Sequence, residues 1–451
     1  MEETSPLIGT SDYKDDTNHM KLYKKRWLIL TIFSLNAMMS QALWFSLSSI
    51  NNIATKYYEV NPSTIDWLAN SFVLGIVIFS LPWAYFTRSW GLRPTLIAAS
   101  SFTAIGCALH YAGSNRNRFY LYLIGQLFAG VPQGPLYQVI PDLSATWFGV
   151  QERAFATCIV MALQFLGSGI GFLQPTYMVP QSDDRRVVEQ GMHNMNLAQL
   201  CMSVVLLLMV YLFFEERPPA PPSISRVIES ETPDMPFTES LKILSRDVQF
   251  NLLLQSISIC NGTAVCLATF LNQFVVNQYP TGYETYIGWM GFIACTAPFF
   301  TTILFGFIVN KYHAFRSVAV GTIFTSMILT VIFFVVLLKT RAFMVIFIDY
   351  ILLGGFALPF LATGMEQAAE LTYPVPEGTT GAVVIMVSFL YAFVMVSALS
   401  VVVEEGKVLL TAAILVGFYL LATILAACVK TNLRRLNTEI DALDYQPTVN
   451  S

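Results

Sequence analysis

Residues 370–384 read ELTYPVPEGTTGAVV, an abrupt polar break between two long apolar runs. Pro374 disfavours helical geometry in the residue before it, and Pro376 suits the first turn of a new helix. Glu377 adds a negative charge at the positive end of that helix. The stretch therefore predicts a tight turn between two helices. Residues 146–153, TWFGVQER, repeat its order of aromatic, valine and glutamate, which indicates an internal duplication.

The composition around this turn is that of a membrane protein. Of the 451 residues, 55% are hydrophobic and 12% are charged, whereas a soluble domain carries about 25% charged residues. The formal net charge of -4 provides no basic surface for nucleic acid, so no such partner is expected. The seven cysteines all fall in apolar runs, where thiols pack as small hydrophobes.

Apolar runs long enough to cross a bilayer, roughly 20 residues each, define the predicted organisation. Twelve such runs occur, at about 27–50, 65–86, 95–113, 119–140, 153–178, 195–214, 248–276, 286–309, 316–338, 342–366, 379–403 and 407–429. A Pro-rich polar insertion divides them six and six. We therefore expect an all-α chain with a tail (1–25), a six-helix bundle (26–214), a linker (215–247), a second six-helix bundle (248–430) and a second tail (431–451).

The distribution of positive charge orients this arrangement. With both termini in the cytoplasm, 17 of the 25 Lys and Arg residues lie on the cytoplasmic side and eight lie outside. An excess of positive charge in cytoplasmic loops is the normal bias of membrane proteins. The sequence thus predicts a multi-pass protein in the lipid bilayer with both termini cytoplasmic.

The two halves carry matching basic turns. Arg88 and Arg93 follow the second run, and Lys311 and Arg316 follow the eighth. Two parallel six-helix repeats with a central linker and basic turns at these places resemble the major facilitator superfamily, whose pseudo-twofold-related bundles meet around a midplane substrate site.

More specific strings narrow the resemblance. They are DWL at 66–68, GLR at 91–93, SATWFG at 144–149, FLNQ at 270–273 and ELTYPVPEG at 370–378, the last preceded by Glu366. From about residue 26 to 435 the chain resembles the feline leukaemia virus subgroup C receptor-related family, solute carrier family 49. The resemblance implies a facilitator for small organic solutes. Choline and ethanolamine are the substrates in one branch, where haem has also been proposed, and vitamin B6 is the substrate in a lysosomal branch.

The resemblance also indicates a substrate contact. Choline-transporting members hold the quaternary ammonium with a tryptophan in the first helix, which matches Trp44. Their tyrosine of the seventh helix falls on Val265, and their glutamines of the fifth and eleventh helices fall near Phe165 and Phe389, with Gln164 one place away.

Several buried polar side chains are candidate substrate ligands. An aromatic face such as that of Trp44 attracts cations when water is excluded. Amides and hydroxyls at membrane depth must face either a cavity or a partner helix, and both alternatives stay open. The candidate set is Gln41, Trp44, Gln133, Tyr137, Gln164, Asn272 and Tyr391.

Two carboxylates are assigned different roles. Asp349 lies well inside the tenth predicted helix, where a charge is costly in lipid and a functional role is the default expectation. We expect it to carry a proton during transport. Asp66 ends the string Ser63-Thr64-Ile65-Asp66 and fits a capping box at a helix start.

The duplicated turns suggest a gate. Glu377 is expected to pair with Lys311 or Arg316, and Glu152 with Arg88 or Arg93, so that each pair latches one face. Arg153 and Glu366 belong to the same set.

A sorting signal is expected in the first tail. Glu3, Leu7 and Ile8 fit the acidic dileucine pattern that sorting adaptors bind, which makes an endolysosomal address an alternative to the plasma membrane. Asn261-Gly262-Thr263 matches a glycosylation sequon but lies inside a predicted helix and should be unused.

No catalytic, cofactor-binding or metal-ligating pattern occurs, so no enzyme is predicted. The expected function is secondary transport by alternating access, with a pocket formed by helices 1, 4, 5, 7, 10 and 11. A choline- or ethanolamine-like organic cation is favoured as substrate. A proton-coupled vitamin B6-like or haem transporter and a solute sensor that does not transport are the alternatives.

Overall fold

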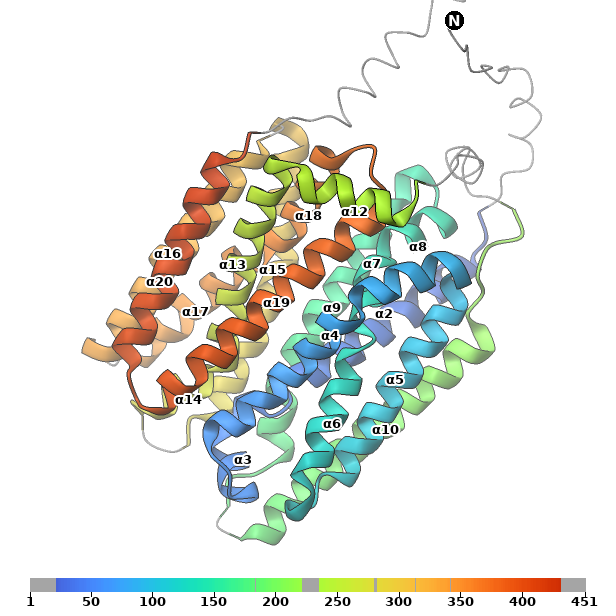
Figure 1. Ribbon diagram of the computed structural model, residues 1–451. Helices are drawn as coiled ribbons and strands as arrows, with labels where there is room; N and C mark the ends of the chain where they lie inside the picture. Colours follow the sequence, from blue (N-terminus) through green and yellow to red (C-terminus); the bar gives the residue numbers. More distant parts are fainter. Residues whose placement is uncertain are drawn as a thin grey trace, which may run out of the picture.

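The computed structural model describes residues 22–182, 184–220, 235–279, 282–312, 314–340 and 342–430, and every regular element in these ranges is helical (Figure 1). Within them, 11 helical segments are long and apolar enough to cross a membrane. A further crossing consists of three short helices over residues 119–147, each below the length of a span. The all-α prediction with twelve crossings is confirmed.

The first half contains six crossings. They are α2 (Lys25–Trp44) with η2 (Ser48–Ile50) and α3 (Asn51–Tyr58), α4 (Pro62–Trp90), α5 (Leu92–Ala112), the broken crossing α6 (Phe119–Gly130), α7 (Gln133–Gln138) and α8 (Ile140–Trp147), α9 (Val150–Met178), and α10 (Arg185–Phe213). A short turn, η3 (Arg116–Arg118), precedes α6.

The second half repeats this order. Its crossings are α13 (Val248–Thr269) with α14 (Leu271–Val276), α15 (Glu284–Tyr312), α16 (Phe315–Val335) with the π-helical η4 (Val336–Thr340), the broken crossing α17 (Phe343–Ala357) and α18 (Pro359–Thr372), α19 (Glu377–Glu404), and α20 (Val408–Cys428).

Both halves interrupt their first and fourth crossings, which the sequence predicted as continuous helices. The first crossings break after Trp44 and at Phe270, and the fourth crossings break near Pro132 and before Pro359. Proline removes a backbone donor and clashes with the preceding helical turn, which accounts for the breaks in the fourth crossings. Because the breaks lie at equivalent places, the duplication extends to backbone irregularities.

The halves contact each other through two related helix pairs, α9 with α15 and α4 with α19 (Figure 1). Exchanging the two halves converts one pair into the other, as pseudo-twofold symmetry requires. Glycines allow the close approach between α9 and α15: a Cβ on Gly169 would lie 3.0 Å from the carbonyl oxygen of Phe292. Small residues at helix interfaces serve this purpose in membrane proteins.

The bundle has two ends, named here by what they carry. The tail face holds the starts of α2 and α13, and the far face holds α3 and α14, at the bottom of Figure 1. The predicted linker contributes an additional helix, α12 (Phe237–Arg246), which contacts α13 and α19 and buries Leu244. On the side of the first half, the Glu216 carboxylate accepts hydrogen bonds from the backbone N–H groups of Leu92 and Arg93 at 2.8 and 2.7 Å.

Candidate functional site

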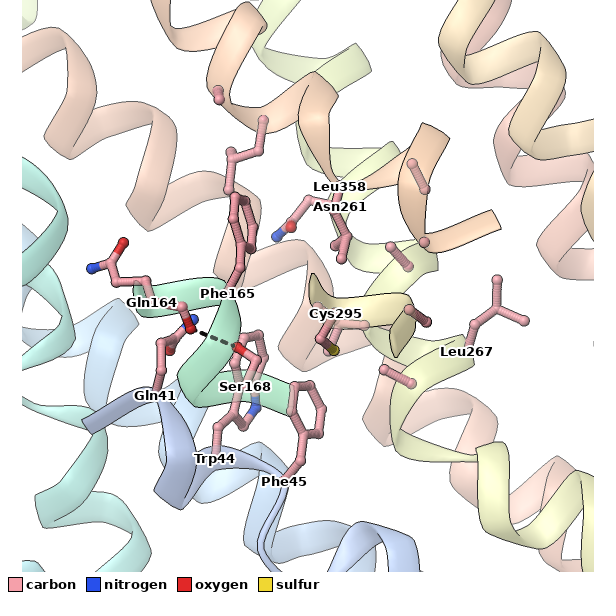
Figure 2. Close-up of a pocket in the computed structure, with 18 of the residues that line it drawn as sticks. Gln41, Trp44, Phe45, Gln164, Phe165, Ser168, Asn261, Leu267, Cys295 and Leu358 are labelled. Carbon is pink, nitrogen blue, oxygen red and sulfur yellow. Dashed lines mark hydrogen bonds between the residues drawn. The ribbon is translucent and has the colours of Figure 1, made fainter. Parts of the chain in front are cut away.

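A cavity of about 90 Å³ lies between the two halves (Figure 2). Its lining comes from α2, α7 and α9 of the first half and from α13, α15, α17, α18, α19 and α20 of the second. All six crossings expected to form the pocket contribute to it. The eighth and twelfth crossings, which were not expected there, add Cys295 and Tyr419.

Four of the seven candidate ligands line this cavity: Gln41, Trp44, Tyr137 and Gln164. The Gln41 Nε2 donates to the Tyr137 hydroxyl at 2.8 Å, and the Gln164 Nε2 donates to the Leu136 carbonyl at 3.1 Å. The Gln41 Oε1 is buried and has no hydrogen-bond partner in the described part of the chain. Gln41 is thus held in place by Tyr137 and keeps an acceptor available.

Trp44 packs in an aromatic cluster. Its ring stacks on Phe45 and Phe72, with centroids 4.4 and 5.6 Å away, and Phe389 of the second half lies at 5.5 Å. Phe45 and Phe389 line the cavity together with Trp44. The indole and Phe389 therefore bring aromatic faces from opposite halves to one site.

The end of α2 fixes the position of Trp44. Where a helix stops, its last carbonyls lose their intrahelical donors. The Gln126 Nε2 of α6 supplies one, donating to the carbonyls of Leu43 and Trp44 at 2.8 and 3.0 Å, and the Ser46 hydroxyl donates to the Leu43 carbonyl at 3.1 Å. The break is thereby stabilised within the bundle, and the indole is presented at a helix end.

The wall formed by the second half is mostly apolar and includes several small residues, with Ala264, Val265 and Ala268 along α13 and Gly354 and Ala357 along α17. Phe165, Val265 and Phe389 also line the cavity. Of the described residues around the cavity, none is charged.

The other three candidate ligands lie elsewhere. The Gln133 Nε2 donates to the Ser40 hydroxyl at 2.8 Å, the Tyr391 hydroxyl donates to Gln255, and the Asn272 Nδ2 donates to the Ser49 carbonyl at 2.7 Å. None of the three lines the cavity. Each makes a hydrogen bond between helices, which is the alternative that the sequence left open for these side chains.

Asn272 belongs to a polar network that joins the halves at the far face. It donates to Asn52 at 3.2 Å, and the Asn52 Nδ2 donates to Glu284 at 2.8 Å. Beside them the Gln273 Nε2 donates to both oxygens of Asp66, at 2.7 and 2.9 Å, and Asn51 donates to Asp66 at 3.0 Å. Buried Asp66 therefore binds an amide of the other half rather than serving as the predicted capping box.

Sequence reasoning missed most of this network. A usable signal existed, because Asn51-Asn52 and Asn272-Gln273 follow the breaks in equivalent crossings of the two halves. Paired amides at membrane depth must find partners. Their equivalent placement could have indicated contact across the interface.

Asp349 is 5% exposed and lies outside the cavity lining. It follows Ile346 by three residues and precedes Leu353 by four, and both neighbours belong to the buried core of the second half. Its Oδ2 has no hydrogen-bond partner among the described residues. A direct contact with a ligand in the cavity is not part of this geometry.

The predicted gating residues lie at the tail face with several partners different from those expected. Glu152 pairs with Arg26 at 3.1 Å rather than with Arg88 or Arg93. Arg88 donates to the Met235 carbonyl at 3.1 Å, and Arg93 donates to the Tyr211 carbonyl at 3.0 Å.

The remaining members of the gating set are basic side chains, which contact backbone carbonyls or an aromatic ring, and two glutamates. Arg153 donates to the Phe148 carbonyl at 3.3 Å, Arg316 donates to the Ala427 carbonyl, and Lys311 lies over the Phe307 ring at 5.6 Å. Glu366 is exposed on α18, and Glu377 begins α19. The pairing proposed for Glu377 stays a prediction. Glu3, Leu7 and Ile8 lie outside the described residues.

Comparisons with known proteins agree with this architecture. The Major Facilitator Superfamily model matches residues 29–399. The choline/ethanolamine transporter flvcr2b of Danio rerio is 27% identical over 97% of this chain and 91% of its own length, and FLVCR2 of Homo sapiens is 25% identical over 95% and 82%. A bacterial homologue of the human lysosomal transporter Spinster, solved in an inward-facing and occupied conformation, has the same fold, with a TM-score of 0.65 at 12% identity over 93% of this chain and 98% of that chain.

The fold and these relatives define a multi-pass membrane transporter, a class that moves solutes rather than transforming them. The chain belongs to the Major Facilitator Superfamily, and within it the chain is similar to transporters of the feline leukaemia virus subgroup C receptor-related family.

Proposed function

We propose that the protein is a secondary transporter for a choline-like organic cation and that it works by alternating access. The observation that carries this proposal is the cavity between the halves, which combines aromatic faces with an uncharged wall. A cation beside the aromatic rings of Trp44, Phe45 and Phe389 gains electrostatic attraction that strengthens when water is excluded. The choline/ethanolamine transporters named among the relatives support the same substrate class.

The chemistry of the cavity favours choline over ethanolamine. A primary ammonium carries three N–H donors, each of which needs an acceptor once it leaves water. A quaternary ammonium has none, so it suits a cavity that Phe165 and Phe389 line with aromatic rings. An acidic solute is disfavoured because the described lining offers no cation.

The far-face network supports the mechanism. Hydrogen bonds from Gln273 to Asp66 and from Asn272 to Ser49 tie the two halves together at that end. With the tail face in the cytoplasm, as the charge bias predicts, this arrangement is closed toward the outside. Rocking of the halves would break the network and open the far face.

Uptake of labelled choline into proteoliposomes tests the substrate. Trp44→Ala removes the indole and should reduce kcat/KM about tenfold, the expected loss for a desolvated cation–π contact, whereas Trp44→Phe should retain much of the activity. Trp67→Ala is the matched control, because Trp67 is 42% exposed and lies away from the cavity. Uptake that is equal in all variants would contradict the assignment of Trp44.

Proton coupling is a second possibility, and Asp349 favours it. A carboxyl that is 5% exposed and has one oxygen without a partner among the described residues is suited to bind a proton during transport. The alternative of a vitamin B6-like transporter is also proton-coupled. Proton coupling predicts that uptake accelerates with an inward proton gradient.

A further inference from the structure

Asn261 has no role in the function proposed so far, although it lines the cavity. It is 7% exposed, and its Nδ2 is buried without a hydrogen-bond partner within the ranges that the structure describes. A buried amide donor left unpaired is costly. A side chain in this state next to a cavity is therefore suited to a ligand.

The surroundings of Asn261 leave space for that ligand. On α13 the residues three, four and seven positions later, Ala264, Val265 and Ala268, line the same cavity and have short side chains. Figure 2 shows Asn261 across the cavity from Gln41 and Gln164, with its amide turned toward the side that Phe165 lines. In the described lining, Asn261 is the only amide that the second half contributes.

The opposite wall holds the complementary group. The Gln41 Oε1 is a buried acceptor without a partner among the described residues, whereas the Asn261 Nδ2 is a donor. A hydroxyl group both accepts and donates a hydrogen bond. The two amides thus match an alcohol that lies between the halves, beside the aromatic faces of Trp44 and Phe389.

We propose that Asn261 is the polar contact of the second half with the substrate and binds its hydroxyl oxygen, while the aromatic wall holds the ammonium. This inference rests on the proposed function and deepens it, because it defines the substrate class as hydroxyl-bearing quaternary ammonium compounds. Because such a substrate contacts both halves, its binding would also affect how the two halves move relative to each other.

The test compares choline with propyltrimethylammonium, which has a methyl group in place of the hydroxyl. In proteoliposomes containing the full chain, competition against labelled choline should show that the wild type prefers choline by about tenfold. Asn261→Leu should remove this preference, so that the ratio of the two affinities falls to about one, and should leave the affinity for propyltrimethylammonium unchanged. Asn261→Ala is measured alongside it and should give the same ratio, in case leucine prevents folding.

Asn251→Ala is the control, because Asn251 is an amide on the same helix α13 that lies outside the cavity lining and donates to the carbonyls of Leu244 and Asp247 at 3.2 and 2.8 Å, so the choline preference should stay intact. A preference retained in both Asn261 variants would overturn the inference while leaving the proposed function standing. If the wild type neither binds nor transports either ammonium compound, the proposed function and the inference are both wrong.

Discussion

Phe389 is the aromatic side chain that the second half places beside Trp44 in the cavity. It comes from the second half and lies 5.5 Å from the indole of Trp44 and 6.4 Å from the ring of Tyr137. The ring adds an aromatic face but supplies no acceptor. The described lining therefore presents a ring rather than a hydrogen-bonding group at this place.

Replacing this ring should change which ammonium is accepted. Phe389→Gln introduces a carbonyl acceptor, and we expect the preference for choline over ethanolamine to fall about fivefold, because a primary ammonium can then donate a hydrogen bond. Competition of both amines against labelled choline measures the ratio. Phe393→Gln, one turn along α19 and outside the cavity lining, should leave the ratio unchanged. An equal change in both variants would refute a local effect.

Asp349 provides a separate prediction at the same scale. Asp349→Asn keeps the shape of the side chain and removes its ability to release a proton, so any pH dependence of uptake should disappear while folding is retained. Uptake measured between about pH 5 and 8, together with thermal unfolding, checks both parts. Unchanged pH dependence in this variant would dismiss Asp349 as the proton carrier.

At the scale of helices, hydropathy located the crossings but not their interruptions. The run at 27–50 contains the apolar residues of a continuous helix, yet α2 stops at Trp44. Gln126, far away in sequence, supplies the donor that makes this end stable. A property that depends on a partner more than 80 residues away is not visible in a local pattern.

The polar residues illustrate the same limit. Gln41 and Gln133 both lie at membrane depth and are equally plausible from the sequence, but only Gln41 lines the cavity. Asn261 lies in a sequon within a predicted helix, a pattern that does not indicate a cavity residue. The types of residue that form the site were therefore predictable. Which of the candidate residues line the cavity depends on how the two halves pack together, and this is not visible in the sequence.

The far-face network should control how the halves open. Gln273→Ala removes the amide that bonds both oxygens of Asp66, and losing such a buried contact costs about 1–3 kcal/mol. We expect the population open at the far face to rise about tenfold. Spin labels at Lys56 and Asn277, exposed residues on opposite halves, would report a longer distance.

Asn251→Ala is the matched control for this measurement. Asn251 is a half-buried amide that also donates hydrogen bonds, but within the second half at the tail face, to the carbonyls of Leu244 and Asp247 at 3.2 and 2.8 Å. It should leave the label distance unchanged. A distribution that is the same for Gln273→Ala and for the wild type would show that the network does not hold the far face closed.

At the scale of the whole molecule, the tail sequence should determine the membrane in which the transporter resides. Replacing Leu7 and Ile8 by alanine removes the hydrophobic pair of the predicted adaptor signal. We expect the double variant, carrying a fluorescent tag, to move from endolysosomal membranes to the cell surface, as measured by imaging and surface biotinylation. Glu3→Ala should have a smaller effect in the same direction, and an unchanged distribution would remove the signal from consideration.

Transport and sensing differ in what the two halves do after the ligand binds. Either function predicts that choline stabilises the native state, by about 2.7 kcal/mol at a concentration 100 times its Kd. Only a transporter then switches the side of the membrane to which the cavity opens and releases the ligand there. Proteoliposomes preloaded with unlabelled choline should therefore take up labelled choline several times faster than empty ones. Gln273→Ala should alter this exchange rate, because it changes the equilibrium between the two open states. Stabilisation by choline without exchange would identify the protein as a sensor built on a transporter fold.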